Sequence, residues 1–301
     1  MSLENNTIYI TGSSGLIGNQ LCNELANHNN AVIKLNRIKH TNPSLCPDWD
    51  LNQEGKQKSN SPDIIIHLAG ENIGAKRWTK NQKELIYNSR VLGTRRLVDK
   101  ICSLKNKPTT FICASAIGYY GDRGSEKLNE NSAPGSNFSA KLSADWEKET
   151  QPLIELGIRV INLRFGVVLS QHSGALKKML FPYKLGLGGS IGKGDQHFSW
   201  ISINDAISAI LYILKTPSLS GPINVTSPHP VTNKTFSKLL AQQLKRPAFF
   251  AMPAGMCRLL FGEMADELLL SSLKVVPDKL IDNGFKFSEP QLPQALKRVL
   301  S

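Results

Sequence analysis

The chain has 301 residues, of which 41% are hydrophobic and 20% charged, a composition typical of a soluble globular protein. The length suits one large domain, or one domain with a small appendage. No apolar run reaches the roughly 18 residues of a membrane helix, and the N-terminus lacks the features of a secretory signal. The five cysteines show no CxxC spacing. We therefore expect a cytoplasmic protein with no disulfide framework and no metal site.

Lys and Arg total 36 against 24 Asp and Glu, which gives a net charge of +12. A basic excess can indicate nucleic-acid binding. Here the charges are scattered, with no run of five like charges and no aromatic RNA-binding signature. We therefore expect no nucleic-acid partner, no membrane partner, and a phosphate-rich small molecule as the ligand.

Short apolar runs alternate with helical patterns through the first half of the chain. Strands are predicted at 7–10, 31–35, 63–68, 109–115 and 160–163, and helices at 16–25, 83–104 and 140–156. Strands that alternate with helices are typical of a parallel sheet covered on both faces. The fold class predicted is therefore α/β, a Rossmann-type doubly wound parallel sheet.

The second half of the chain has a different texture. The glycine-rich segment 186–194 is predicted to be irregular. A helix ending near 214, a short strand at 223–225 and a helix at 232–244 follow, and then short helices broken by Pro253, Pro277 and Pro293. We expect a main Rossmann domain at 1–170 that takes strands back from 200–230, a smaller mixed substrate-side lobe at 171–246, and a helical segment at 247–301.

A GxxGxxG turn occupies residues 11–18, between the first predicted strand and the first predicted helix. In such turns the first glycine permits a sharp bend, the second lets a pyrophosphate approach the backbone, and the third allows close packing of helix and strand. Free N–H groups at the helix start can bind phosphate. A purely structural glycine loop is the alternative, but the position between strand and helix favours a dinucleotide site. The contacts predicted here are Gly12, Ser14, Gly15, Leu16, Ile17 and Gly18.

The end of the second strand indicates which dinucleotide binds. An NAD site carries an acidic residue about 20 residues beyond the glycine turn, but no Asp or Glu occurs from residue 25 to residue 47. Asn36 and Arg37 stand there instead, and a guanidinium can bind a 2′-phosphate. We predict NADP in preference to NAD. The alternative is that Arg37 is a solvated surface residue and the site is indifferent.

Specific motifs extend over nearly the whole chain. They are HLAGENI at 67–73, KRWT at 76–79, NSR at 88–90, GYYG at 118–121, ADWE at 144–147, RFGVVL at 164–169, GLGG at 186–189, FSWI at 198–201, FGEMAD at 261–266, VVP at 275–277 and NGF at 283–285. Together with the glycine turn, they resemble the extended short-chain dehydrogenase/reductase superfamily. More narrowly, they resemble its atypical NAD(P)-dependent epimerase family, which is sugar-nucleotide epimerase-like and carries an extra C-terminal domain of unknown function.

The resemblance implies further cofactor contacts. Leu68, Ala69 and Gly70, after the third strand, should lie beside the ribose and adenosine. Arg90 stands where many relatives carry a cofactor-facing Asn, and Asp50 matches a position near the adenine. These assignments complete the adenosine half of the predicted site.

The resemblance also implies a substrate side. Val167 falls where the chain passes the nicotinamide, and Gln196 and His197 are the polar contacts expected from the wall formed by 188–200. Glu71 and Asn72 follow the third strand at the carboxyl end of the sheet, where ligands bind in such folds. The alternative for this last pair is hydrogen bonding within their own loop.

The superfamily's mechanism implies a tyrosine that exchanges a proton with the substrate oxygen, a lysine four residues later, and a Ser or Thr hydroxyl. Lys141 is the candidate lysine, but Asn137 stands where the tyrosine belongs, so the YxxxK pair is absent. Ser115 lies one residue before the usual hydroxyl position, and Tyr119 or Tyr120 could replace the missing phenol. The alternatives are packing roles for both tyrosines and a surface or ribose-contacting role for Lys141.

The expected function is therefore an NADP-dependent oxidoreductase or epimerase that transfers a hydride to or from a small polar substrate, such as a nucleotide sugar. The alternative is a non-catalytic NADP-binding sensor or partner-binding protein, which the missing YxxxK pair and the apolar runs at 259–261 and 268–270 would suit. His67 and Cys113 are interpreted as core residues. The superfamily resemblance leaves a homodimer open.

Overall fold

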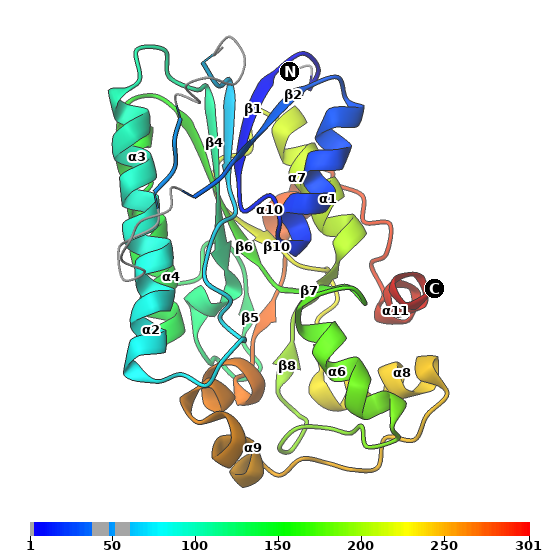
Figure 1. Cartoon of the computed structure of the whole chain (residues 1–301). Coiled ribbons are helices and arrows are strands. Elements are labelled where there is room, and N and C mark those ends of the chain that lie inside the picture. The colour runs from blue at the N-terminus through cyan, green and yellow to red at the C-terminus, as the bar shows by residue number, and fades with distance from the viewer. Residues whose placement is uncertain (1–2, 38–47, 52–60) are drawn as a thin grey trace.

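The computed structural model describes residues 3–37, 48–51 and 61–301 (Figure 1). Its centre is a parallel sheet in the order β10-β6-β4-β3-β1-β2. The strands are β1 (Thr7–Thr11), β2 (Ala31–Leu35), β3 (Ile64–His67), β4 (Thr110–Ala116), β6 (Arg159–Phe165) and β10 (Gly221–Val225). The sheet confirms the predicted doubly wound α/β class. Its edge strand β10 comes from beyond residue 170.

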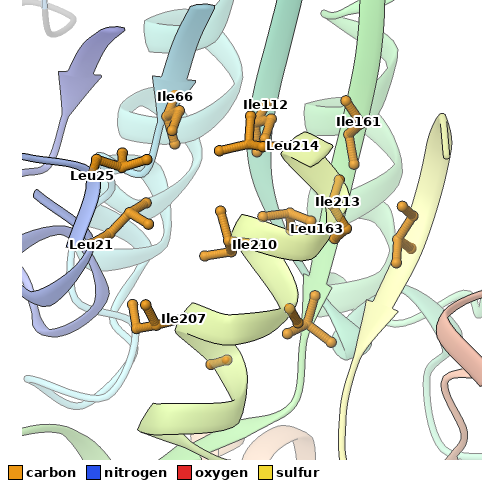
Figure 2. Close-up of a cluster of buried hydrophobic side chains, with 14 of the residues drawn as sticks. Leu21, Leu25, Ile66, Ile112, Ile161, Leu163, Ile207, Ile210, Ile213 and Leu214 are labelled. Atoms are coloured by element: carbon orange, nitrogen blue, oxygen red, sulfur yellow. The ribbon is translucent and has the colours of Figure 1, made fainter. Parts of the chain in front are cut away.

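Helices cover both faces of the sheet (Figure 1). Helices α1 (Leu16–Asn27) and α7 (Ile203–Lys215) cover one face, and α2 (Lys80–Tyr87), α3 (Gly93–Ser103), α4 (Phe138–Lys148) and α5 (Gln151–Glu155) cover the other. Figure 2 shows Leu21 and Leu25 of α1 and Ile210 of α7 beside Ile66 and Ile112 of the sheet, all fully buried. Each such side chain contributes about 1.5–3 kcal/mol through burial. This packing fixes the parallel strands so that their carboxyl ends lie together at one end of the sheet.

The predicted helices at 83–104 and 140–156 differ in detail from the observed ones. The first is α2 and α3 joined by a π-helical stretch, η1 (Asn88–Leu92), which contains Arg90. The second divides into α4 and α5, because Pro152 lies in the first turn of α5, where its missing N–H costs no helical hydrogen bond.

A smaller lobe follows the sheet. It contains β7 (Val167–Leu169), α6 (Gly174–Lys184), β8 (His197–Phe198), β9 (Trp200–Ser202), β11 (Val231–Thr232) and α8 (Asn233–Leu244). Leu176 of α6, Trp200 and Phe236 of α8 are buried in its own apolar cluster. Residues 186–194 are irregular, as predicted, apart from one bridge between Ile191 and Met252. Helix α6 was not predicted.

The C-terminal segment packs back onto the rest of the molecule. It forms α9 (Ala254–Phe261), the π-helix η3 (Ala265–Leu270), β12 (Lys274–Val275), α10 (Asp278–Asp282) and α11 (Leu292–Leu300), and β12 pairs with β5 (Lys127–Leu128). Short helices form here, as the sequence predicts, and each of the three prolines stands at the start of one. Pro253 and Pro277 immediately precede helices and Pro293 lies in the first turn of α11, positions where proline is tolerated. Among the described helices, none has the length and apolar character to cross a membrane.

Candidate functional site

The glycine turn joins β1 to α1 and leaves no room for side chains. A Cβ on Gly12, whose φ is +71°, would lie 2.7 Å from the Leu68 carbonyl carbon, and one on Gly18 would lie 2.2 Å from the Gly12 oxygen. Gly15 is the N-cap of α1, and no side chain caps the helix there. The first-turn N–H groups are therefore open to an anion, and the cradle fits a dinucleotide pyrophosphate.

A cavity of about 550 Å³ adjoins this turn. Ser14, Gly15 and Leu16 form one wall, and the loop 170–173 and Arg298 form others. Among the residues that the structure describes, no Asp or Glu lines it. The lining therefore favours a polar or anionic group beside the predicted phosphate contacts.

Asn36 and Arg37 lie exposed just beyond the carboxyl end of β2. The backbone of Arg37 bridges to Trp49, which is buried and directly precedes Asp50. Among the described residues, no ion pair engages the Arg37 guanidinium. A positive charge is thus presented at the edge of the sheet where the sequence predicts the 2′-phosphate.

The segment after β3 runs beside the glycine turn. Ala69 donates its backbone N–H to Thr11 Oγ1 at 3.3 Å, next to Leu68. A Cβ on Gly70 would lie 3.3 Å from Arg90 Cζ, and the Arg90 guanidinium lies 5.2 Å from the centre of the Trp146 ring. Burial lowers the pKa of Arg90 to about 10, against an opposing effect of Glu71, so Arg90 is charged at neutral pH. The structure thus brings these predicted residues together.

Asn72 takes part in a turn of its own loop. Its Oδ1 accepts the Gly74 N–H at 3.0 Å, and the side chain is exposed. The Glu71 N–H is bound by Ser89 Oγ at 3.0 Å. Loop hydrogen bonding, the alternative interpretation, therefore describes Asn72 in this structure.

Ser115, near the end of β4, has its proton committed to a neighbouring carboxylate. Its Oγ lies 2.6 Å from Glu147 Oε1 on α4, and Arg164 of β6 donates to both oxygens of Glu147 at 2.8 Å. A carboxylate only accepts, so Ser115 donates its single proton there. The Ser115 oxygen is then left with lone pairs and cannot polarise a substrate carbonyl as a donor. Sequence reasoning missed Glu147 and Arg164, although the ADWE and RFGVVL motifs contain them.

The two tyrosines have different surroundings. Tyr120 is fully buried; its hydroxyl donates to Asn224 Oδ1 at 2.7 Å and accepts from Arg164 Nη1 at 3.0 Å. Burial raises the pKa of Tyr120 to about 12. Tyr120 is therefore a structural residue, which corrects its expected part in catalysis. Tyr119 is half-buried, with its ring centre 3.5 Å from the Arg164 guanidinium carbon.

Asn137 starts α4 instead of serving as a proton donor. Its Oδ1 accepts the Ala140 N–H at 3.0 Å. Glu267 of η3 accepts the N–H groups of Phe138 and Ser139, the first two residues of α4, at 3.0 and 2.9 Å. Lys141, the fourth residue of α4, is exposed. Glu267, from the C-terminal segment, is a third functional residue that the sequence patterns did not indicate.

Gln196 and His197 lie at the predicted wall, and the Gln196 side chain hydrogen-bonds to backbone carbonyls. Its Nε2 donates to the carbonyls of Ile191 and Leu269 at 3.0 Å. This clamp fixes the Gln196 amide group at the wall, and its expected substrate contact stays a prediction. His197 contacts Ser272 Oγ through Nδ1 at 3.3 Å, and burial together with Lys274 lowers its pKa.

A small cavity lies at this wall. Val167, Gln196 and His197 line it together, with a volume of about 40 Å³, space for about one or two water molecules. The structure therefore brings together the nicotinamide-side residue and the substrate-side histidine predicted from sequence.

His67 is a core residue, as interpreted from the sequence. It is fully buried between Thr11 Oγ1 at 2.7 Å and Thr94 Oγ1 at 3.1 Å, and burial lowers its pKa to about 3. Cys113 is likewise fully buried. In the described parts of the chain, no group of three or more His, Cys, Asp or Glu is arranged to hold a metal ion.

The doubly wound sheet and the glycine cradle define the class as a Rossmann-type nucleotide-binding protein. The profile of the NAD dependent epimerase/dehydratase family matches residues 8–226, and that of a domain of unknown function, DUF1731, matches 252–299. The chain belongs to the NAD dependent epimerase/dehydratase family. This confirms the resemblance inferred from the motifs.

Relatives match over nearly the full length. The chain is 36% identical to the epimerase family protein YfhF of Bacillus subtilis, over 98% of both chains. It is similar to human epimerase family protein SDR39U1 solved with NADPH, with a TM-score of 0.85 and 27% identity over 97% of this chain and 98% of that one. It is also similar to a nucleoside-diphosphate sugar epimerase from Corynebacterium glutamicum, with a TM-score of 0.78 and 34% identity over 99% of this chain and 59% of that one.

Proposed function

We propose that this protein is an NADP(H)-dependent oxidoreductase or epimerase that acts on a small polar substrate, with a nucleotide sugar as the favoured class. One observation carries the proposal: a glycine cradle closed to side chains stands one strand away from an exposed, unpaired Arg37 among the described residues. The cradle suits a pyrophosphate, and the guanidinium suits a 2′-phosphate. The similar human protein solved with NADPH supports this choice.

Residues of the chain are assigned to proton transfer, ribose binding and substrate binding. The bound nicotinamide would supply or accept the hydride. Tyr119 Oη is the group we assign to hold and move the substrate proton, because its ring is half-buried on the Arg164 guanidinium while the Tyr120 hydroxyl is fully used. Lys141 stands exposed on α4, free to contact the ribose. Val167 and His197 share the small cavity that we assign to the reacting end of the substrate.

Two observations support a nucleotide sugar as the substrate class. The similar structure named as a nucleoside-diphosphate sugar epimerase supports a nucleotide sugar. The net charge of +12 also favours an anionic substrate. We also place the protein in the cytoplasm, because the four described cysteines are all unpaired.

The test is a substrate screen. Purified protein is mixed with NADPH or NADP and a panel of nucleotide sugars and small carbonyl compounds, and absorbance at the reduced-nicotinamide band is followed, with product analysis for epimers. The proposal expects turnover with at least one member of the panel. Turnover that is the same in Tyr119→Phe would contradict the role of Tyr119.

A second function has its own support. Asn137 caps α4 where the superfamily's tyrosine would stand, and the Ser115 proton is committed to Glu147. Both features suit a non-catalytic NADP-binding sensor. Tight NADPH binding without turnover of any panel member would favour this alternative over the enzyme.

A further inference from the structure

The net positive charge is concentrated in one part of the chain. Residues 171–262 contain ten Lys and Arg but only two acids, Asp195 and Asp205, and therefore carry +8 of the net +12. Asp205 is buried and binds the backbone N–H groups of Ser288 and Glu289. The surface of this region is thus almost free of negative charge.

The same region exposes large apolar side chains. Phe249 is 86% exposed and Phe181 is 72% exposed, and Leu185, Leu187 and Phe250 are also exposed. We call these five residues the apolar tip. Single exposed apolar residues are normal on a protein surface, whereas a group of them marks an interaction site.

The members of the apolar tip come from two segments that lie side by side. The Phe250 N–H donates to the Gly188 carbonyl at 3.3 Å, and a Cβ on Gly186 would lie 3.4 Å from Pro247. In Figure 1 the connection from α8 to α9 passes the end of α6 at the extremity of the molecule away from β1 and β2. The tip therefore projects outward at one end of the molecule.

Cations accompany the apolar side chains. Lys177 and Phe181 of α6 and its C-cap residue Leu185 follow one another at intervals of four, which places them along one side of the helix. Lys245 and Arg246 begin the connection between α8 and α9 that also carries Phe249. All four cations around the tip are exposed, and no ion pair among the described residues engages them; they are Lys177, Lys184, Lys245 and Arg246.

We propose that the apolar tip docks on the surface of an anionic phospholipid bilayer, with the phenyl rings entering the interface and the four cations meeting lipid phosphates. Protruding apolar side chains ringed by cations match this environment. The tip residues line neither the cavity at the glycine turn nor the one at His197, so the cofactor region stays open during docking. A second copy is disfavoured, because two regions of charge +8 would repel. This proposal replaces the expectation of no membrane partner and is independent of the proposed reaction.

The experiment is co-sedimentation of the purified full-length protein with vesicles. One set is phosphatidylcholine alone and the other contains phosphatidylglycerol as an anionic component, at low and at physiological salt. We expect binding to the anionic vesicles only, weakening as salt rises.

Two double variants and two matched controls test the residues. Phe249→Ser with Phe250→Ser removes two rings, and Lys245→Glu with Arg246→Glu reverses two charges; each should weaken vesicle binding at least tenfold. The apolar control replaces Ile154 and Leu156, which are 45% and 47% exposed on or beside α5, with serine. The charge control replaces the exposed Lys105 and Lys148 with glutamate. Both controls should bind like the parent protein.

NADPH titration and thermal melting verify that each variant is folded. Absence of binding to anionic vesicles, equal binding to neutral vesicles, or equal losses in the control variants would overturn the proposal. Self-association in solution that disappears in the Phe249/Phe250 variant would also overturn it, and would assign the tip to a second copy.

Discussion

At the scale of single residues, a continuous buried hydrogen-bond network lies beneath the proposed site. Ser115 binds Glu147, Glu147 pairs with Arg164, and Arg164 reaches the hydroxyl of Tyr120, which binds Asn224. Arg164 is 3% exposed and Glu147 12% exposed at their side chains, so removing either partner would leave a charge uncompensated. The network holds the ends of β4, β6 and β10 in register around Tyr119.

The two tyrosines should therefore respond differently to loss of the hydroxyl. Tyr120→Phe leaves Asn224 Oδ1 without its buried donor, and we expect about 1–3 kcal/mol lower stability in urea melts. Tyr119→Phe should change stability by less than about 0.5 kcal/mol and lower turnover about 10²-fold or more. Equal stability losses in both variants would show that this division is wrong.

His67 makes stability depend on pH. Its pKa is about 3 in the folded state, against 6.5 for a free histidine, so the unfolded state binds more protons between those values. Stability is therefore lost as pH falls below about 6.5. From pH 7 to pH 5 the loss from this residue is about 2 kcal/mol. Urea melts of His67→Gln should show a free energy of unfolding that differs less between pH 7 and pH 5 than that of the parent protein. An unchanged difference would show that other groups cause the pH dependence.

At the scale of elements, the start of α4 depends on a distant segment. Asn137 and Glu267 together accept three N–H groups of its first turn. A carboxylate at a helix N-terminus is also favoured by the helix dipole. The C-terminal segment thus caps the N-terminus of α4, the helix that carries Lys141.

Glu267→Gln keeps the shape but removes the charge. We expect about 1 kcal/mol lower stability, measured by chemical denaturation. Glu263→Gln is the matched control in the same segment. In the described part of the chain, Glu263 forms an exposed pair with Lys83, and such pairs contribute about 0–1 kcal/mol. A larger effect at Glu263 than at Glu267 would contradict the capping role.

Elements with a strong local pattern were predictable. The strands of the sheet and helix α8 follow from apolar patterns in the sequence. Helix α6 was missed because Pro182 lies inside it and glycines follow it, and its stability comes from packing of Leu176 and Leu180 in the lobe. Short pairs such as β5 with β12 depend on contacts between remote segments, which no local pattern reveals.

At the scale of the whole molecule, the glycine turn, Arg37 and the segment after β3 meet at one sheet edge because parallel strands end together there. That part of the candidate site was predictable from sequence. The roles of Ser115, Tyr120 and Gln196 were not, because they depend on partners distant in sequence: Glu147, Asn224 and Leu269.

Calorimetric titration of NADPH and NADH into the parent protein and into Arg37→Glu measures whether Arg37 selects the dinucleotide. We expect the parent protein to prefer NADPH by about tenfold or more, the value of a charge-assisted phosphate contact. We expect Arg37→Glu to lose this preference while its affinity for NADH is unchanged. Lys105→Glu, an exposed charge change elsewhere, should behave like the parent. No binding of either dinucleotide, or an NADPH preference that survives Arg37→Glu, would show that the glycine turn and Arg37 do not form an NADP site.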